Sequence, residues 1–316
     1  MNPKAVKWRM DCMPIFSKLS TPMSRRIGLM GIGSAIVALV SGCSGAQVLD
    51  HLVPHDTYHG PTGVSYGPDP RHLLDVYQPQ PATDTVPGHA PVVLFLYGGN
   101  WTSGERAMYR FVGEALAANG IIAVVADYRL SPQVHYDGFL GDCALALQWT
   151  LSHAAGLGGN PERVMVMGHS AGAYNAAMLA LDPRWLAPLD LTPNRLAGWI
   201  GLAGPYDFLP IVDPEVQLAF GWPHTPANSQ PIFHAKAKAP RTLLLAARND
   251  TVVDAQRNTV GLANRLRTGG TEVEMRIFDH IGHVTTVAAL ARPLGWLAPI
   301  LPTAVAFVRG ESLPQT

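Results

Sequence analysis

The chain has 316 residues, of which 47% are hydrophobic, and it carries 23 Lys+Arg against 23 Asp+Glu, so its formal net charge is zero. This length and apolar content suit one large α/β domain with a sizeable buried core. The balanced charge gives no reason to expect a nucleic-acid partner or an electrostatic attachment to a membrane. The three cysteines, Cys12, Cys43 and Cys143, lie far apart without the spacing of a zinc site or a disulfide framework. The composition therefore indicates neither nucleic-acid binding, nor a zinc site, nor a disulfide scaffold.

The first 43 residues have the pattern of an export signal. Arg25 and Arg26 precede an apolar run over residues 27–40, and small residues follow before Cys43. This is the order of a charged region, an apolar region and a cleavage site, and the run is too short to span a membrane comfortably. The residues Val40-Ser41-Gly42-Cys43 resemble the bacterial lipobox, in which the cysteine is lipidated and becomes the new N-terminus. An ordinary signal peptide with an incidental cysteine is the alternative.

These features divide the chain into a signal (residues 1–43), a polar tether (44–63) and a catalytic domain (64–316). A lipidated Cys43 would attach the protein to a membrane through its acyl chains. We expect an exported protein that is anchored in the bacterial cell envelope. Ser44, where retained lipoproteins carry Asp, favours the outer membrane with the domain facing the periplasm. A secreted or periplasmic protein is the alternative.

Downstream of the tether, buried strands alternate with helices. Most of the strands are continuous apolar runs, as in a parallel sheet, whereas Val273–Phe278 alternates apolar and charged residues like a strand at a sheet edge. This order predicts a mostly parallel, doubly wound sheet with helices on both faces, in which ligands bind beyond the C-terminal ends of the strands. The expected strands cover residues 73–77, 91–97, 121–125, 163–167, 197–202, 242–247 and 273–278, and the expected helices 106–119, 139–153 and 171–181.

A Gly-x-Ser-x-Gly pentapeptide, residues 168–172, joins the strand ending at Met167 to the helix that follows. A serine on such a tight turn has a strained backbone, and its hydroxyl projects above the sheet. Gly168 and Gly172 are required because a side chain there would collide with the neighbouring strand and helix. The N–H of Ala171 stands at a helix N-terminus, where it can face a developing oxyanion.

Six pieces of the sequence, in this order, resemble α/β-hydrolases of the bacterial carboxylesterase and arylformamidase-like branch over residues 64–309. The resemblance implies an α/β-hydrolase fold with a small insertion over the active site. The pieces are Tyr97-Gly98-Gly99-Asn100-Trp101 with Gly104, Asp127-Tyr128-Arg129-Leu130, Gly168-His169-Ser170-Ala171-Gly172, Gly204-Pro205-Tyr206-Asp207, Asn249-Asp250 with Val252, and Gly282-His283.

Ser170 is the candidate nucleophile, and it needs a base because a serine hydroxyl is inert at neutral pH. His283 matches the position of the family's base after the last strand, and His280 is its competitor. Asp250 follows the strand that ends at Ala247, where an acid can orient the imidazole, whereas Asp254 suits the first turn of the next helix. The order Ser170, Asp250, His283 is the order of this fold.

The oxyanion hole is expected to use the backbone N–H groups of Gly99, Asn100 and Ala171. Relatives mostly carry His-Gly-Gly where this chain has Tyr97-Gly98-Gly99. Because the donors are main-chain amides, the tyrosine does not remove them. It leaves open how the loop is braced.

Trp101, His169 and Tyr206 are the candidate substrate-pocket residues. Trp101 either lines the acyl pocket or packs the loop after its strand. Tyr206 belongs to residues 205–234, a segment rich in proline and aromatics that we expect to be a cap-like insertion forming a pocket wall. A plain surface loop is the alternative.

The sequence therefore predicts a serine hydrolase that cleaves small carboxylic esters through an acyl-enzyme, with no metal or organic cofactor. An aryl-formamide hydrolase is the nearest alternative, since an activated amide needs the same machinery. A non-catalytic binding protein on the same fold is a further alternative, although such proteins usually lack a member of the triad.

Overall fold

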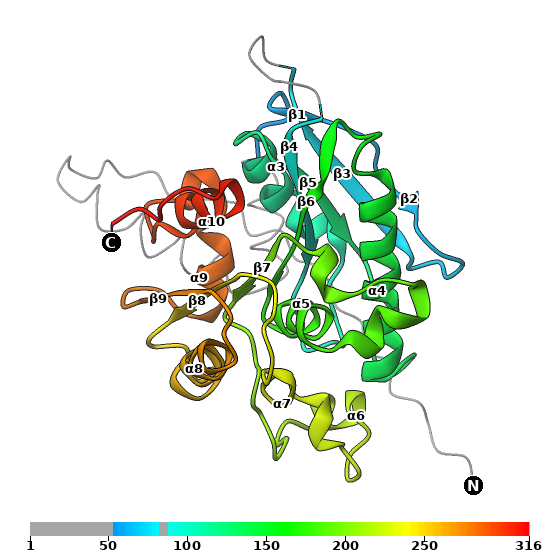
Figure 1. The fold of residues 1–316 in the computed structure, drawn as a ribbon, viewed down its shortest axis with the longest axis vertical. Coiled ribbons are helices and arrows are strands. Elements are labelled where there is room, and N and C mark those ends of the chain that lie inside the picture. Colours follow the sequence, from blue (N-terminus) through cyan, green and yellow to red (C-terminus); the bar gives the residue numbers. More distant parts are fainter. Residues whose placement is uncertain (1–52, 82–87, 316) are drawn as a thin grey trace, which may run out of the picture. The chain divides into compact units, whose positions relative to one another are not determined.

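A mostly parallel sheet runs through the part of the chain that the computed structural model describes, residues 53–81 and 88–315 (Figure 1). Within these residues the sheet has nine strands in the order β1-β3-β5-β4-β6-β7-β8-β9, with β2 paired to β3. The strands are Tyr58–His59 (β1), Val64–Ser65 (β2), Leu73–Pro79 (β3), Ala90–Leu96 (β4), Ile122–Ala126 (β5), Gly159–His169 (β6), Gly198–Leu202 (β7), Thr242–Ala247 (β8) and Val273–Phe278 (β9).

The strand order places the ends of β4 and β6 side by side. Strands β5, β4, β6, β7, β8 and β9 are parallel neighbours, whereas β1, β2 and β3 pair antiparallel. The chain leaves β4 toward β5 and later returns to β6 on its other side, so β4 and β6 flank a topological switch point. Loops diverge at such a point and leave a crevice beyond the strand ends. The predicted doubly wound sheet is confirmed, and β9 lies at its edge as expected.

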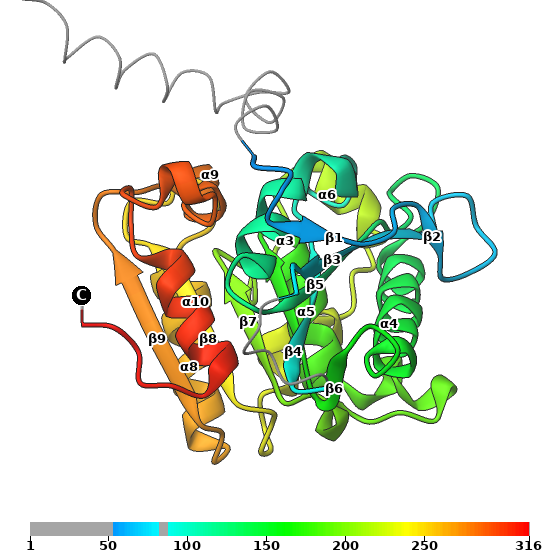
Figure 2. The same ribbon diagram turned by 90° about the horizontal axis from the view of Figure 1, so that it is seen from above.

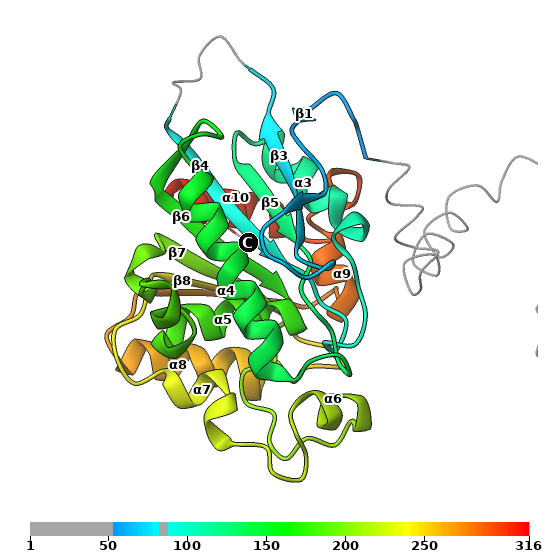
Figure 3. The ribbon, with the colours of Figure 1, turned by 90° about the vertical axis from the view of Figure 1, so that its right-hand side faces the viewer.

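Helices cover both faces of the sheet. Figure 3 shows α4 and α5 on one face, and α3 and α10 behind the strands on the other. Figure 2 shows α6 and α9 at one edge of the molecule, with the arrowhead of β9 pointing toward α9. The helices are Arg110–Ala117 (α3), Tyr136–His153 (α4), Ala171–Leu181 (α5), Pro214–Ala219 (α6), Pro231–His234 (α7), Gly261–Thr268 (α8), His283–Ala288 (α9) and Ile300–Arg309 (α10).

Two helix starts differ from the expected ones. The helix expected over residues 106–119 begins as a 3-10 turn, Arg106–Tyr109, whose first backbone N–H donates to the Asp127 carboxylate. Helix α4 begins at Tyr136, three residues before the predicted Phe139.

The export signal and Cys43 lie outside the described residues. Among residues 53–81 and 88–315, none of the helices is both long and apolar enough to cross a membrane.

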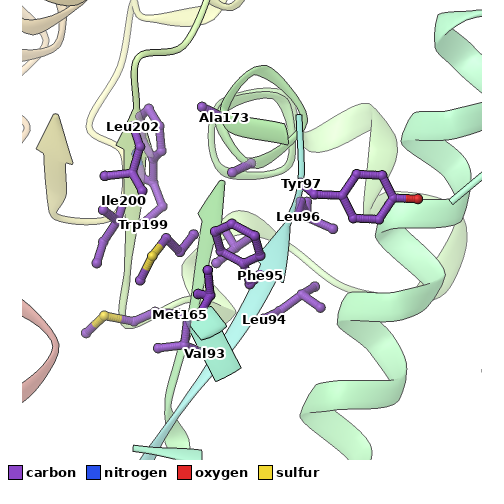
Figure 4. Close-up of a cluster of buried hydrophobic side chains, with 14 of the residues drawn as sticks. Val93, Leu94, Phe95, Leu96, Tyr97, Met165, Ala173, Trp199, Ile200 and Leu202 are labelled. Carbon is purple, nitrogen blue, oxygen red and sulfur yellow. The ribbon is translucent and has the colours of Figure 1, made fainter. Parts of the chain in front are cut away.

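The core lies on both sides of β4, β6 and β7. Val93, Leu94, Phe95 and Leu96 in β4 are fully buried although their side chains alternate between the two faces. Figure 4 shows these residues packing with side chains of β6, β7 and α5. Burial on both faces explains why these strands are uninterrupted apolar runs, whereas the edge strand β9 is mostly half-buried.

A buried ion pair joins α4 to the loop after β5. The Asp142 side chain is 1% exposed, and its oxygens accept the backbone N–H of Arg129 at 2.9 Å and the guanidinium Nη2 at 2.6 Å. This two-point contact holds the loop that follows β5 against the helix.

Replacing Asp142 should therefore destabilise the fold. We expect Asp142→Ala to lower the free energy of unfolding by about 2–3 kcal/mol, because Arg129 loses charge-assisted hydrogen bonds in a mostly buried site. Urea denaturation measures this change. The control is Glu162→Ala, which breaks an exposed pair with Arg195 and should cost less than about 1 kcal/mol. Equal losses in the two variants would contradict the prediction.

Candidate active site

Ser170 stands on a sharp turn between β6 and α5. Its φ of 53° and ψ of −121° form a conformation that costs a non-glycine residue about 1–3 kcal/mol. A Cβ at Gly168 would lie 2.1 Å from the Gly172 carbonyl oxygen, and one at Gly172 would lie 2.0 Å from the Leu96 carbonyl oxygen. Both glycines are thus required by the close approach of β4, β6 and α5, as the sequence predicts.

Ser170, His283 and Asp250 meet beyond the C-terminal ends of the strands. His283 Nε2 lies 2.8 Å from Ser170 Oγ, and His283 Nδ1 lies 2.8 Å from Asp250 Oδ2. Ser170 follows β6, Asp250 follows β8 and His283 follows β9. The structure therefore brings together three residues that are separated by up to 113 positions in the sequence.

The alternative base, His280, and the alternative acid, Asp254, lie outside this hydrogen-bonded group. His280 is exposed to solvent, whereas the His283 side chain is only 11% exposed. Asp254 accepts the backbone N–H of Arg257 at 2.8 Å and so stands at the start of a helical turn, as expected.

Hydrogen bonds keep the Asp250 carboxylate in its charged form. Its Oδ1 accepts the N–H groups of Val252 at 2.8 Å and Val253 at 2.9 Å. Burial by itself would raise the pKa of Asp250, but the hydrogen bonds from His283 and from these two amides outweigh it and lower the pKa below its usual value. A charged Asp250 holds the proton on Nδ1 of His283 and leaves the Nε2 lone pair free to accept from the Ser170 hydroxyl.

The loop after β4 borders Ser170 on its other side. Gly99 has a φ of 130°, and Asn100 and Trp101 follow in the left-handed region with φ of 52° and 59°. The backbone N–H groups of Thr102 and Ser103 both donate to the Gly99 carbonyl at 3.0 Å, and these hydrogen bonds close a tight turn. Asn100 and Ala171 line the same pocket as Ser170. The three residues expected to form the oxyanion hole thus belong to two turns that flank Ser170.

Tyr97 braces this loop from behind. Its hydroxyl donates to Asp127 Oδ1 at 3.0 Å and accepts from Arg71 Nη2 at 2.8 Å, while the Tyr128 hydroxyl donates to the Tyr97 carbonyl at 2.7 Å. Its ring stacks on Tyr128 with centroids 4.8 Å apart. Burial raises the pKa of Tyr97, so the hydroxyl remains a donor. The tyrosine therefore supplies, through Asp127 and Arg71, the support that the sequence left open.

A pocket of about 450 Å³ opens beside Ser170. Its walls come from the loop after β4, the segment that starts at Pro205, and the loop after β8. The cap-like segment therefore forms one wall of the pocket, although it also carries exposed surface residues such as Val212 and Leu218. Most of the lining is apolar, including Trp101, Phe208, Ile211, Val212, Val216 and Val253.

Trp101 both lines the pocket and packs the loop. Its side chain is 2% exposed, its Nε1–H donates to Asn175 Oδ1 at 3.0 Å, and its ring stacks on Phe208 with centroids 5.9 Å apart. Lining the pocket and packing the loop were the two alternatives for Trp101, and the structure shows both.

Comparison with known proteins finds esterases that are similar in sequence. The BD-FAE family model matches residues 74–196. The chain is 32% identical over 155 residues to the probable isoprenylcysteine alpha-carbonyl methylesterase ICMEL1 of Arabidopsis thaliana, covering 48% of this chain and 32% of that protein. It is 31% identical over 223 residues to the probable carboxylic ester hydrolase LipM of Mycobacterium tuberculosis, covering 65% of this chain and 51% of that one.

Solved structures show the same fold. Esterase B from Lactobacillus rhamnosis superposes with a TM-score of 0.70 at 19% identity, covering 87% of this chain and 96% of that chain. The apo form of Thermogutta terrifontis esterase 2 gives a TM-score of 0.65 at 21% identity, covering 83% and 98%. The chain has an α/β-hydrolase fold, and its sequence is similar to that of proteins in the esterase/lipase family. It spans between about a third and a half of the length of the two curated relatives named above.

Two residues expected in the pocket lie behind it instead. Tyr206 is fully buried, with its hydroxyl 2.0 Å from where a Cβ at Gly201 would be, so the residue packs against β7. His169 is 5% exposed, and its Nε2 contacts the backbone carbonyl of His283 at 3.0 Å. Both residues are adjacent in sequence to residues that do line the pocket.

Asn258, which no sequence pattern marks, anchors the cap-like segment. Asn258 Oδ1 accepts the backbone N–H groups of Tyr206 at 2.6 Å and Asp207 at 2.8 Å, and Arg257 pairs with Asp207. These partners are about 50 positions apart and form no local pattern, so nothing in the sequence marks them. Across the described ranges, 53–81 and 88–315, no group of three or more His, Cys, Asp or Glu side chains is placed to hold a metal ion.

The buried His169 should make stability depend on pH. Burial, together with the nearby His283, lowers the pKa of His169 from 6.5 to about 3. The unfolded chain therefore binds a proton between these values that the folded chain does not, and the free energy of unfolding falls as the pH drops from about 6.5 toward 3.

We expect the stability advantage of wild type over His169→Gln to shrink by about 2 kcal/mol between pH 7 and pH 5, because one buried group contributes about 1.4 kcal/mol per pH unit. Urea denaturation at the two pH values measures it. Between pH 7 and pH 5 the folded protein keeps Asp250 ionised, because the pKa of this carboxylate is lowered below its usual value. The exposed-histidine control, His280→Gln, should show no such change, and a parallel pH dependence of wild type and His169→Gln would refute the prediction.

Proposed function

We propose that this protein hydrolyses small carboxylic esters through an acyl-enzyme, with Ser170, His283 and Asp250 as the catalytic triad. The observation that carries the proposal is the pair of 2.8 Å contacts that links Ser170 to His283 and His283 to Asp250 beside an apolar pocket. Two relatives, a probable carboxylic ester hydrolase and a probable methylesterase, support the class of bond.

In the first step, Ser170 Oγ attacks the ester carbonyl while His283 Nε2 takes its proton. The carbonyl oxygen becomes an oxyanion, and the backbone N–H groups of Gly99, Asn100 and Ala171 are the proposed donors to it. Main-chain donors that are fixed in place stabilise such charge without reorganising, and each is worth on the order of a hundredfold in rate. His283 then returns the proton to the departing alcohol, and the acyl group remains on Ser170.

In the second step, a water molecule gives its proton to His283 and attacks the acyl carbonyl. Ser170 leaves with the returned proton, and the carboxylic acid is released. Asp250 stays ionised throughout and stabilises the imidazolium that forms twice in the cycle. Its lowered pKa suits this task.

Replacing the triad should abolish turnover. Ser170→Ala and His283→Ala are each expected to lower kcat at least about 10⁴-fold, and Asp250→Asn by about 10³- to 10⁴-fold, because the three act as one unit. Hydrolysis of p-nitrophenyl acetate and butyrate measures the rates, and a fluorophosphonate probe should label wild type but not Ser170→Ala.

His280→Ala is the matched control for the base, and it should keep its activity within about twofold. If wild type takes no label and cleaves neither ester, the hydrolase proposal is wrong. Near-full activity of His283→Ala would move the base to another residue.

We further propose that residues 1–43 direct export and that Cys43 is lipidated, which would anchor the enzyme in the bacterial cell envelope. The support is the order Arg25-Arg26, apolar run, Val40-Ser41-Gly42-Cys43. A single acyl chain binds a membrane only marginally, so the proposal requires more than one chain on this residue.

The lipid anchor is tested by expressing the full chain in a bacterium that processes lipoproteins. We expect the mature N-terminus to be an acylated Cys43 by mass spectrometry and the protein to partition into the membrane fraction. Cys43→Ala should abolish both results. An unmodified mature chain that starts at another residue would rule out lipidation.

A further inference from the structure

His169 occupies a place that the proposed mechanism does not use. It ends β6 directly before Ser170, and its ring is 5% exposed. Its Nε2–H donates to the backbone carbonyl of His283 at 3.0 Å, and the centroids of the two imidazole rings are 5.0 Å apart. His169, which precedes the proposed nucleophile Ser170, is therefore hydrogen-bonded to the main chain of the proposed base His283.

This contact crosses the sheet. His169 belongs to β6, whereas His283 follows β9, and two strands, β7 and β8, lie between them. The covalent and sheet connections between nucleophile and base therefore run through two intervening strands and their loops. The hydrogen bond from His169 joins the two ends directly.

The surroundings fix which nitrogen carries the proton. A carbonyl oxygen only accepts, so the proton of a neutral His169 must sit on Nε2. The other nitrogen, Nδ1, is buried and has no hydrogen-bond partner among the described residues. A Cβ on Gly98 would lie 3.1 Å from this Nδ1 and 2.9 Å from the Ser170 Cβ, so the oxyanion loop closes over it. A second proton on the ring would find no acceptor there.

The ring also stays neutral while the base works. The ionisable groups that act on it are His283 and Asp250, and a charged His169 would oppose the imidazolium that forms on His283. Burial disfavours the charged form further. A neutral donor can hold the His283 main chain without lowering the basicity of its ring.

We propose that His169 is a positioning residue that ties the main chain of His283 to the end of β6 and so keeps its imidazole in line between Asp250 and Ser170. This inference rests on the proposed triad. A displacement of about 1 Å in a catalytic group can cost on the order of a hundredfold in rate, so such a link would act on turnover more than on substrate binding.

Two substitutions separate the hydrogen bond from the shape of the ring. His169→Phe keeps a planar ring but removes the donor, and it should lower kcat about 10- to 100-fold with KM within about twofold of wild type. In His169→Gln the side-chain amide can donate from nearly the same position, so we expect activity within about fivefold of wild type. If the phenylalanine variant does not fold, His169→Met replaces it as the apolar variant without a donor.

Two readouts distinguish positioning from a merely structural role. A looser contact between Asp250 and His283 stabilises the imidazolium less, so the acid limb of the kcat/KM profile should move to lower pH in His169→Phe. The low-field proton resonance of His283 Nδ1–H, which reports its bond to Asp250, should weaken or disappear in the same variant and return in His169→Gln. A role in stability alone would lower the melting temperature and leave both readouts unchanged.

The proposal fails if folded His169→Phe keeps the wild-type kcat, acid limb and resonance, or if His169→Gln is as impaired as His169→Phe. Failure of the esterase proposal looks different. In that case wild type takes no fluorophosphonate label, whereas the resonance still reports whether His169 holds His283 in place.

Discussion

The close approach of three backbones around Ser170 is the constraint on which the site depends. Leu96 at the end of β4 pairs with Gly168 in β6, and Gly172 at the start of α5 packs against the Leu96 carbonyl. Because no side chain separates these segments, the turn that carries Ser170 and the loop that follows β4 emerge at the same point. The strained φ of Ser170 is tolerated because packing on both sides leaves the chain no other path.

The remaining parts of the site are held by contacts that approach it from outside the sheet. Tyr97, Asp127 and Arg71 support the loop after β4 from behind, and Asn258 fixes the cap-like segment that forms a pocket wall. Asp250 is held in its charged form by two backbone amides. Each of these groups is buried or half-buried and satisfied by a polar partner, which makes the geometry rigid as well as stable.

The parts of the fold and site that follow a local pattern were predictable. Continuous apolar runs predicted the buried strands, and the alternation of apolar and charged residues in Val273–Phe278 predicted the edge strand. Gly168 and Gly172 predicted the tight turn that carries Ser170. The errors arose where a residue's environment comes from distant segments. The helix expected at residue 106 begins with a 3-10 turn, whose first N–H donates to Asp127, 21 positions away. Tyr206 and His169 were expected in the pocket but face inward.

By itself, the sequence determined the order of strands and helices, the strained serine turn and the short list of residues able to act as acid or base, since these depend on residue type and local spacing. Only the tertiary structure placed His283 rather than His280 beside Ser170, showed how Tyr97 braces the loop after β4, and hydrogen-bonded His169 to the carbonyl of His283. Those outcomes depend on the pairing of strands far apart in the chain. Parallel packing brings their ends together, and no local pattern records which side chains then meet.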